Sequence, residues 1–220
     1  MDVAKTAGTL ILVSNGVYAT GGRTVYGGIT NRVAVPLPLT LRSVHGPNVT
    51  LICGFQTSDT TNGDSAVRCV SLSSGAILDG FTLTNGATRT LGDPDLEQSG
   101  GGAWCADSSV VLTTCVMANN AAAQYGGGAR YGTLADCVVS GNSASYGGGA
   151  YFGILSACSL MRNVATYGGA SAYGSLTNCS MVGNSASSSG GAAYYGLHSE
   201  GQFPSNSASF GGGCSYSELI

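Results

Sequence analysis

The chain has 220 residues, of which 43% are hydrophobic and only 9% are charged, and its net charge is −3 at pH 7. Its one lysine and seven arginines are scattered, so we expect no surface for nucleic acid. No apolar run reaches the roughly 18 residues of a transmembrane helix, so we expect no membrane insertion.

The first 13 residues lack the basic region and the small-residue cleavage site of a signal peptide. Eight cysteines, few charges and abundant serine, threonine, asparagine and glycine nevertheless favour a secreted or cell-surface protein.

The first half of the chain predicts short strands that follow one another in twos, each two joined by a turn. Short runs of alternating apolar residues are bounded there by Gly, Asn and Pro, which are typical of turns. The predicted pairs lie in residues 9–20, 38–54 and 75–86. Longer loops are expected at about 55–66 and 87–99.

From residue 125 the sequence repeats, in blocks of 21, 21, 21 and 22 residues and a last incomplete block. Equivalent positions form columns of one residue type. The columns are tyrosines (Tyr125, Tyr146, Tyr167), a second aromatic set (Tyr131, Phe152, Tyr173, Tyr195, Tyr216), leucines (Leu134, Leu155, Leu176), cysteines (Cys115, Cys137, Cys158, Cys179) and asparagines (Asn120, Asn142, Asn163, Asn184, Asn206).

A strand of four to six residues cannot stand alone, but it is stabilised when it stacks about 4.8 Å from an identical strand. Since strand side chains alternate, each column cysteine and the apolar residue two positions later should both face inward. Each column asparagine should lie at a turn and hydrogen-bond the next one along the stack. The glycine runs should supply tight or left-handed backbone at another corner.

The sequence therefore predicts an all-β, right-handed parallel β-helix of about 21 residues per coil. Residues 1–220 form one domain in this interpretation, with irregular coils at 1–98 and regular repeats at 99–220. Nine or ten coils would make a rod of about 45 Å. Leucine-rich repeats and helical solenoids fit the spacing and composition less well.

Two family resemblances rest on these motifs. ILVSNGVY, LTLRSVHGPNVTLICG and AILDGFTLTNG resemble the opening coils of the pectin-lyase-like β-helix superfamily. A short helix caps the first coil in such proteins, and residues 1–8 resemble its end. The second half is similar to the passenger domains of chlamydial-type polymorphic membrane proteins, since GGA occurs five times and FxxN occurs at Phe203–Asn206. Both resemblances imply the fold more strongly than a function.

The acidic cluster of Asp93, Asp95 and Glu97 lies in the expected loop 87–99. Such carboxylates could bind Ca²⁺, or act as acid and base in polysaccharide cleavage as the resembled superfamily implies. We favour a solvated insertion between coils, because no calcium-loop pattern is present. The candidate basic partners for a lyase are Arg89, Arg130 and Arg162.

The column cysteines allow three interpretations: buried thiols that pack as small apolar groups, disulfides, or a metal site. We favour the first, because the thiols lie in a line rather than converge on a point. Cys53 with Cys69, and Cys105 with Cys115 or Cys214, remain possible bridges. No metal, cofactor or catalytic residue is assigned.

Tyr125, Tyr146 and Tyr167 are candidates for stacking on sugar rings, but we favour packing of one aromatic column in the core and of the other over a corner. We expect a structural or adhesive surface module rather than an enzyme, whose partners are surface glycans, a host surface or other copies of the chain. Copies stacked end to end would cover the open edges of the stack. The alternative is a polysaccharide-binding or polysaccharide-cleaving β-helix.

Overall fold

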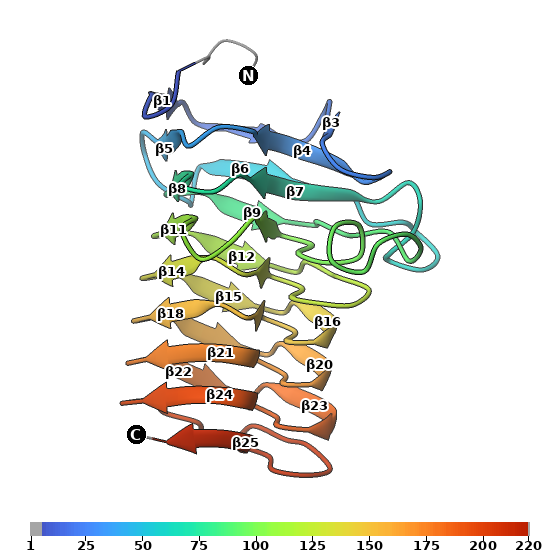
Figure 1. The fold of residues 1–220 in the computed structure, drawn as a ribbon, viewed down its shortest axis with the longest axis vertical. Coiled ribbons are helices and arrows are strands. Elements are labelled where there is room, and N and C mark those ends of the chain that lie inside the picture. The colour runs from blue at the N-terminus through green and yellow to red at the C-terminus, as the bar shows by residue number, and fades with distance from the viewer. Residues whose placement is uncertain (1–5, 220) are drawn as a thin grey trace.

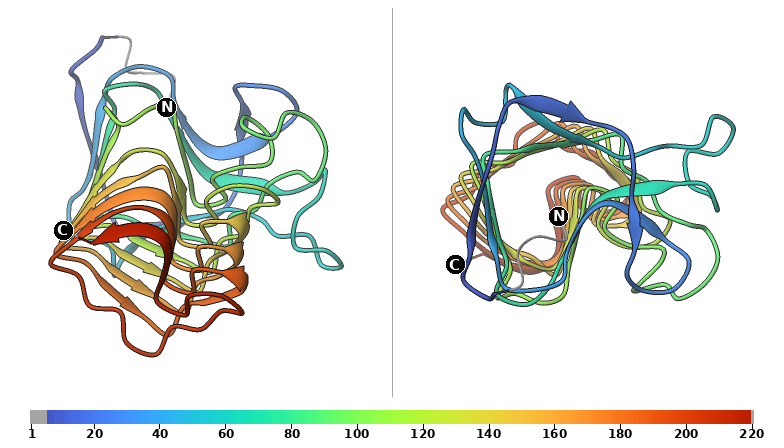
Figure 2. Two further views of the ribbon diagram at one scale, coloured as in Figure 1. Left: turned by 60° about the horizontal axis from the view of Figure 1, so that its bottom comes forward. Right: turned by 90° about the horizontal axis from the view of Figure 1, so that it is seen from above.

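The computed structural model describes residues 6–219 as a stack of coils whose strands lie across the long axis (Figure 1). Almost all strands pair in parallel with a strand of the next coil; among the described residues, β3 and β4 form the antiparallel strand pair. Seen along the axis, the chain turns clockwise as it recedes from the N-terminal end (Figure 2). The prediction of a right-handed parallel β-helix is confirmed.

The strands form four columns that run along the rod. The first is β1 (Leu10–Val13), β5 (Thr40–Ser43), β8 (Ile77–Asp79), β11 (Val111–Thr113), β14 (Thr133–Ala135), β18 (Ile154–Ser156), β21 (Ser171–Thr177), β24 (Ala193–Ser199) and β25 (Cys214–Leu219). The second is β3 (Arg23–Thr24), β4 (Thr30–Val35), β7 (Val67–Leu72), β10 (Ala103–Cys105), β13 (Ala129–Arg130) and β17 (Ala150–Tyr151), which β21 joins to the first.

The other two columns are separate sheets. The third is β2 (Gly16–Tyr18), β6 (Thr50–Cys53), β9 (Thr82–Thr84), β12 (Val116–Ala118), β15 (Val138–Ser140), β19 (Ser159–Met161) and β22 (Ser180–Val182). The fourth is β16 (Ser143–Tyr146), β20 (Val164–Tyr167) and β23 (Ser185–Ser189). The first column gives nine coils within residues 6–219.

The irregular first half has the same architecture as the repeats. The strands predicted to follow one another across a turn are β1 and β2, β5 and β6, and β8 and β9, and the two members of each set lie in different sheets. Loops fill 55–66 and 87–99 as expected. The expected end of a capping helix falls mostly on residues 1–5, which lie outside the described residues.

The core is made of the inward side chains of the first, second and third columns. The predicted leucine column continues in register toward the N-terminal coils, where Leu112, Leu78 and Leu41 occupy the position of Leu134. The inward position two residues after each column cysteine is buried at Met117, Val139, Leu160 and Met181, whereas Phe203 is only partly buried. Full burial of such a side chain contributes about 1.5–3 kcal/mol, so regular stacking of like on like supplies the main stabilisation.

Each regular coil turns at four left-handed residues spaced five apart. In one coil these are Gly147, Phe152, Ala157 and Arg162, with φ of 61°, 52°, 51° and 52°. The coils before and after repeat the pattern. A 21-residue coil is therefore four five-residue sides plus one residue. Sequence analysis predicted glycine at one corner only; at the other corners several non-glycine residues adopt a backbone that costs an L-residue about 1–2 kcal/mol.

The corner at Arg162 offers a stabilising substitution, because the equivalent corners of the adjacent coils are Gly141 and Gly183. Arg162 is exposed, and Arg162→Gly is expected to raise the free energy of unfolding by about 0.5–1 kcal/mol, since it removes left-handed strain. Urea denaturation measures the change. Val164→Gly, on the exposed side of β20, is the matched control and should destabilise. An equal loss in both variants would contradict the explanation by strain.

Candidate functional site

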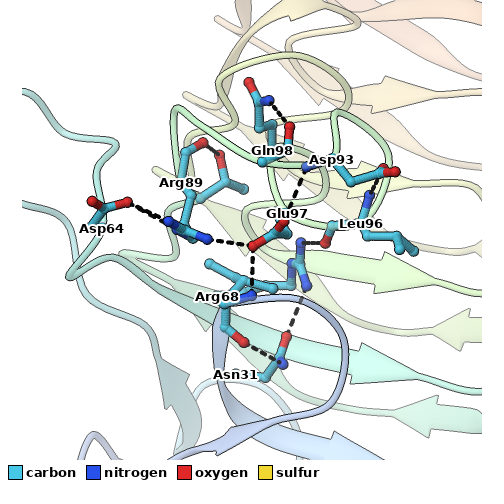
Figure 3. Close-up of polar contacts among 12 residues, drawn as sticks. Asn31, Asp64, Arg68, Arg89, Asp93, Leu96, Glu97 and Gln98 are labelled. Atoms are coloured by element: carbon cyan, nitrogen blue, oxygen red, sulfur yellow. Dashed lines mark hydrogen bonds and ion pairs between the residues drawn. The ribbon is translucent and has the colours of Figure 1, made fainter.

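Glu97 anchors the acidic loop 87–99 to the stack (Figure 3). Its carboxylate is buried and accepts hydrogen bonds from the Gly28 N–H (2.6 Å), the Asp93 N–H (3.0 Å) and Arg89 Nη1 (2.5 Å). The two backbone N–H groups, of Gly28 and then Asp93, and the Arg89 guanidinium lower the pKa of Glu97. Arg89 also pairs with Asp64, at 2.8 Å.

The other two carboxylates of the loop have different partners. Asp93 Oδ1 accepts the N–H groups of Asp95 (2.8 Å) and Leu96 (2.9 Å), which shapes the turn. Asp95 forms an ion pair with Arg130 of β13, at 2.5 Å. The loop is thus packed onto the stack rather than fully solvated. With each carboxylate engaged, the geometry favours a structural role for all three.

Two of the three candidate arginines pair with carboxylates of this loop: Arg89, itself a loop residue, with Glu97, and Arg130 with Asp95. Arg162 stands at the exposed corner described above. Within residues 6–219, no three His, Cys, Asp or Glu side chains are grouped so that they could hold a metal ion.

Glu97→Ala is expected to release loop 87–99 while the coils stay folded, because the loop loses its contacts to Gly28 and Arg89 but the ladders do not. Limited proteolysis should show faster cleavage within 87–99 than in the unaltered chain. Asp59→Ala, on the exposed part of the other loop, is the control and should leave the cleavage pattern unchanged. Unchanged cleavage in Glu97→Ala would show that the anchor is dispensable. Because the folded pKa is depressed, the anchor should act fully above the ordinary pKa of about 4.3 and weaken as pH falls through the folded value.

Arg68 is a buried cation that sequence analysis missed. It is 1% exposed, and its acceptors are the carbonyls of Gly100, Leu96 and Ser99 and the side-chain oxygen of Asn31 (Figure 3). Burial, followed by the charge of Arg130, lowers the pKa of Arg68 to about 9. This side chain joins the end of the loop to β4 and β7.

Two groups of aromatic rings, joined by the guanidinium of Arg130, run along the rod beside the loop and form what we call the aromatic network. Arg130 lies between its two parts, with its guanidinium 3.7 Å from the Tyr131 ring centroid and 5.2 Å from that of Trp104. The rings in contact are Tyr26, Trp104, Tyr125, Tyr131, Tyr146, Tyr151, Phe152, Tyr167, Tyr173, Tyr194, Tyr195 and Tyr216. The repeats in the sequence predict two of its columns but not Tyr26, Trp104, Tyr151 or Tyr194.

The second aromatic column forms parallel stacks. Phe152, Tyr173, Tyr195 and Tyr216 follow one another at centroid distances of 5.1, 5.3 and 5.0 Å, with interplanar angles of 12° or less. Each is a left-handed corner, so all four side chains leave the coil in the same direction. Stacked rings cover one another's faces and present their edges outward. This geometry favours coil-to-coil packing over stacking on sugars, which needs a free ring face.

Tyr125, Tyr146 and Tyr167 lie at the end of the fourth column and are half-buried. Tyr146 and Tyr167 stack at 4.9 Å, and Tyr125 stacks on Tyr151 at 4.5 Å. Burial and then the neighbouring phenol of Tyr125 raise the pKa of Tyr151 to about 12. These tyrosines therefore pack mainly against one another.

A small pocket lies where the network begins. Tyr26 and Trp104 line it with Val35 and Pro36, and Ser71 and Ser73 add hydroxyl groups. Trp104 Nε1 donates to the Asp95 carbonyl, at 2.8 Å. The Ser73 hydroxyl is buried and has no hydrogen-bond partner within the described residues. The pocket thus presents the two aromatic rings, whereas the Ser73 hydroxyl is not accessible.

The outward side of the third column is a face without charge, which we call the β9–β22 face. Its strands β9, β12, β15, β19 and β22 each have one buried residue between two half-exposed ones. The half-exposed residues stack in register as Thr82, Val116, Val138, Ser159 and Ser180, and as Thr84, Ala118, Ser140, Met161 and Val182.

The asparagine column forms a continuous amide ladder inside the stack. The backbone N–H and Nδ2 of each of Asn120, Asn142, Asn163 and Asn184 donate to Oδ1 of the next asparagine, at 2.8–3.1 Å. Asn206 receives the last of these bonds. This ladder occupies the corner that the sequence spacing predicts, and its role is structural.

The cysteines are free thiols. No disulfide joins any of the eight, all of which lie within the described residues. The column of Cys115, Cys137, Cys158 and Cys179 is buried in the core. The neighbouring thiol of Cys115 and burial raise the pKa of Cys137 to about 12, so the thiol stays protonated and poorly reactive. The geometry agrees with the first of the three interpretations, in which the column thiols are buried and pack as small apolar groups.

A search of protein-family models returned no match for this sequence, and a search of the curated proteins returned none. Within residues 6–219, no helix has the length and apolar character needed to cross a bilayer.

Proposed function

We propose that the chain is a structural or adhesive module of an extracellular or cell-surface protein, which contacts a neutral, repetitive partner through its sides. The observation that supports this most is the β9–β22 face, whose ten outward side chains include no charge over five coils. A face without charge does not need to desolvate ions when it binds, and it favours association.

Two classes of neutral partner fit a face that repeats at every coil: an uncharged surface glycan, and another copy of the chain. Copies that stack end to end are a further form of self-association, because an unpaired strand edge can pair with another chain. The likeness of the repeats to the passenger domains of polymorphic membrane proteins supports a surface module of this kind. The pectin-lyase-like likeness supports the fold of the first half.

The test is retention of the full chain on surfaces coated with neutral polysaccharides or with the chain itself. Binding through an uncharged face should persist when salt is raised to about 1 M, where charge attraction is screened within about 3 Å. A variant with Val116→Lys, Val138→Lys, Ser159→Lys and Ser180→Lys should lose at least tenfold in retention. These side chains are half-exposed, so the core is untouched.

The matched control places four lysines on the outward side of the first column, at Thr113, Ala135, Ser156 and Thr177. It has the same added charge and should keep its retention. Failure of the unaltered chain to bind any of these surfaces, or release of the bound chain by salt, would overturn the proposal.

The second candidate function is polysaccharide binding or cleavage, and the exposed ring of Tyr26 beside Trp104 is the observation that favours it. Tyr26→Ala should then weaken binding of soluble neutral oligosaccharides, and Tyr18→Ala, outside the ring network, should not. If the chain cleaves polysaccharides, the unaltered protein should depolymerise one of them, and replacement of Asp93, Asp95 and Glu97 by alanine should abolish that activity.

A further inference from the structure

His198 occupies a position that leucine fills in the preceding coils. Its β24 neighbour in register is Leu176 of β21, which continues the column of Leu155 and Leu134. The ring is 2% exposed. A titratable side chain has therefore replaced an apolar one in the core, one coil before the end of the described stack.

The site gives the ring no polar partner. Both ring nitrogens are buried without a hydrogen bond to any described residue. The aromatic neighbour is Phe203, whose ring lies 6.1 Å away at 75°. Burial lowers the pKa of His198, and no neighbouring charge contributes.

The titratable groups on the surrounding elements are thiols, phenols and two exposed carboxylates. Glu200 and Glu218 are exposed, and Glu218 pairs in register with Leu197 on the outward side of the strand. None offers the ring an acceptor. These groups are Tyr173 on β21, Cys179 just after β21, Tyr194 and Tyr195 on β24, Glu200 in the following turn, and Cys214, Tyr216 and Glu218 on β25.

We propose that His198 makes the last described coil acid-sensitive: protonation of its ring releases residues 199–219 from the stack while the coils before it stay folded. An imidazolium needs acceptors or water for both N–H groups, and burial without them is costly. Water can reach the ring most readily on the side of Phe203, which is only partly buried. His198 pairs in register with Leu219 of β25, so disruption at the ring acts directly on that strand.

The direction with pH follows from linkage. The folded pKa is depressed, so the unfolded coil binds more protons at acid pH. The contribution to stability is complete above the ordinary histidine pKa of about 6.5, and it is lost as pH falls through the lower folded value.

Hydrogen exchange of the full chain between about pH 7.5 and pH 5, corrected for the intrinsic rate, tests the inference. Amides in residues 199–219 should lose protection at least tenfold on acidification, while those in 111–177 should keep it. His198→Leu restores the column and should abolish the acid-induced loss; His198→Met serves the same purpose if leucine packs poorly.

The chain has one other histidine, which supplies the control. His45 is exposed and its ring contacts Asn15 Oδ1 at 2.6 Å, so His45→Asn should leave the acid response of residues 199–219 intact. The same acid response in His198→Leu or His198→Met, or uniform opening of all coils, would overturn the inference. This test uses no binding partner, so its outcome is independent of the proposed function.

Discussion

Asn163→Ala is expected to destabilise the stack by about 3–5 kcal/mol, because each buried polar group left without a partner costs about 1–3 kcal/mol. Asn163 is fully buried in the middle of the amide ladder. Its Oδ1 accepts the backbone N–H and Nδ2 of Asn142, both at 3.0 Å. Its own Nδ2 donates to the Val139 carbonyl at 2.9 Å and to Asn184 Oδ1 at 3.0 Å. Alanine would remove all four bonds and leave donors on one side of the gap and acceptors on the other.

Denaturation in urea, followed by circular dichroism, measures this loss as a lower midpoint. Asn178→Ala is the matched control, because Asn178 is an exposed left-handed corner and Ala157 already stands at the equivalent corner of the preceding coil. The control should change stability by less than about 1 kcal/mol. If both variants lost the same amount, the ladder would contribute no more than a surface asparagine.

Gly148→Ala is expected to cost about 3 kcal/mol or more, because the coils leave no room for a methyl group there. A Cβ at this position would lie 2.4 Å from the Val164 carbonyl oxygen and 2.6 Å from that of Gly169, and both are backbone atoms of the next coil. The coils would have to separate locally, which also weakens the hydrogen bond from the Gly148 N–H to Gly168.

Gly183→Ala separates crowding from backbone strain. Gly183 is left-handed at φ 63°, but a Cβ there would meet only the side chain of Arg162, at 3.8 Å. Its cost should be the left-handed strain alone, about 1–2 kcal/mol. Calorimetry of the two variants should therefore rank Gly148→Ala as the less stable. The reverse order would mean that the glycine runs are required for their conformation rather than for close contact between coils.

The repeats made the core predictable. A 21-residue period puts equal residues on top of one another, so one coil's alternation fixes which side of every coil faces inward. Leu134, Leu155 and Leu176, and the asparagine column, followed from that argument alone. Leu41 and Leu78 belong to the same column, but the irregular spacing of the first half gave no sign of it in the sequence.

The contacts of loop 87–99 could not be predicted in this way. Glu97 meets Gly28 across 69 residues, and Arg130 meets Asp95 across 35, with no periodic signal for either. The corners were hidden for another reason. Thr114, Asp136, Ala157 and Asn178 share a left-handed backbone but no chemistry, so their conformation comes from the stack and not from local preference.

The direction of the hydrogen bonds between coils has a mechanical consequence. Strands lie across the rod, so their backbone bonds and the amide ladder run along it (Figure 1). A tensile force applied along the rod would load these bonds coil after coil in series. Each released coil of 21 residues adds roughly 70 Å of extended chain. The stack would lengthen stepwise under tension and dissipate work at each step, while a sideways load would be shared by many coils at once.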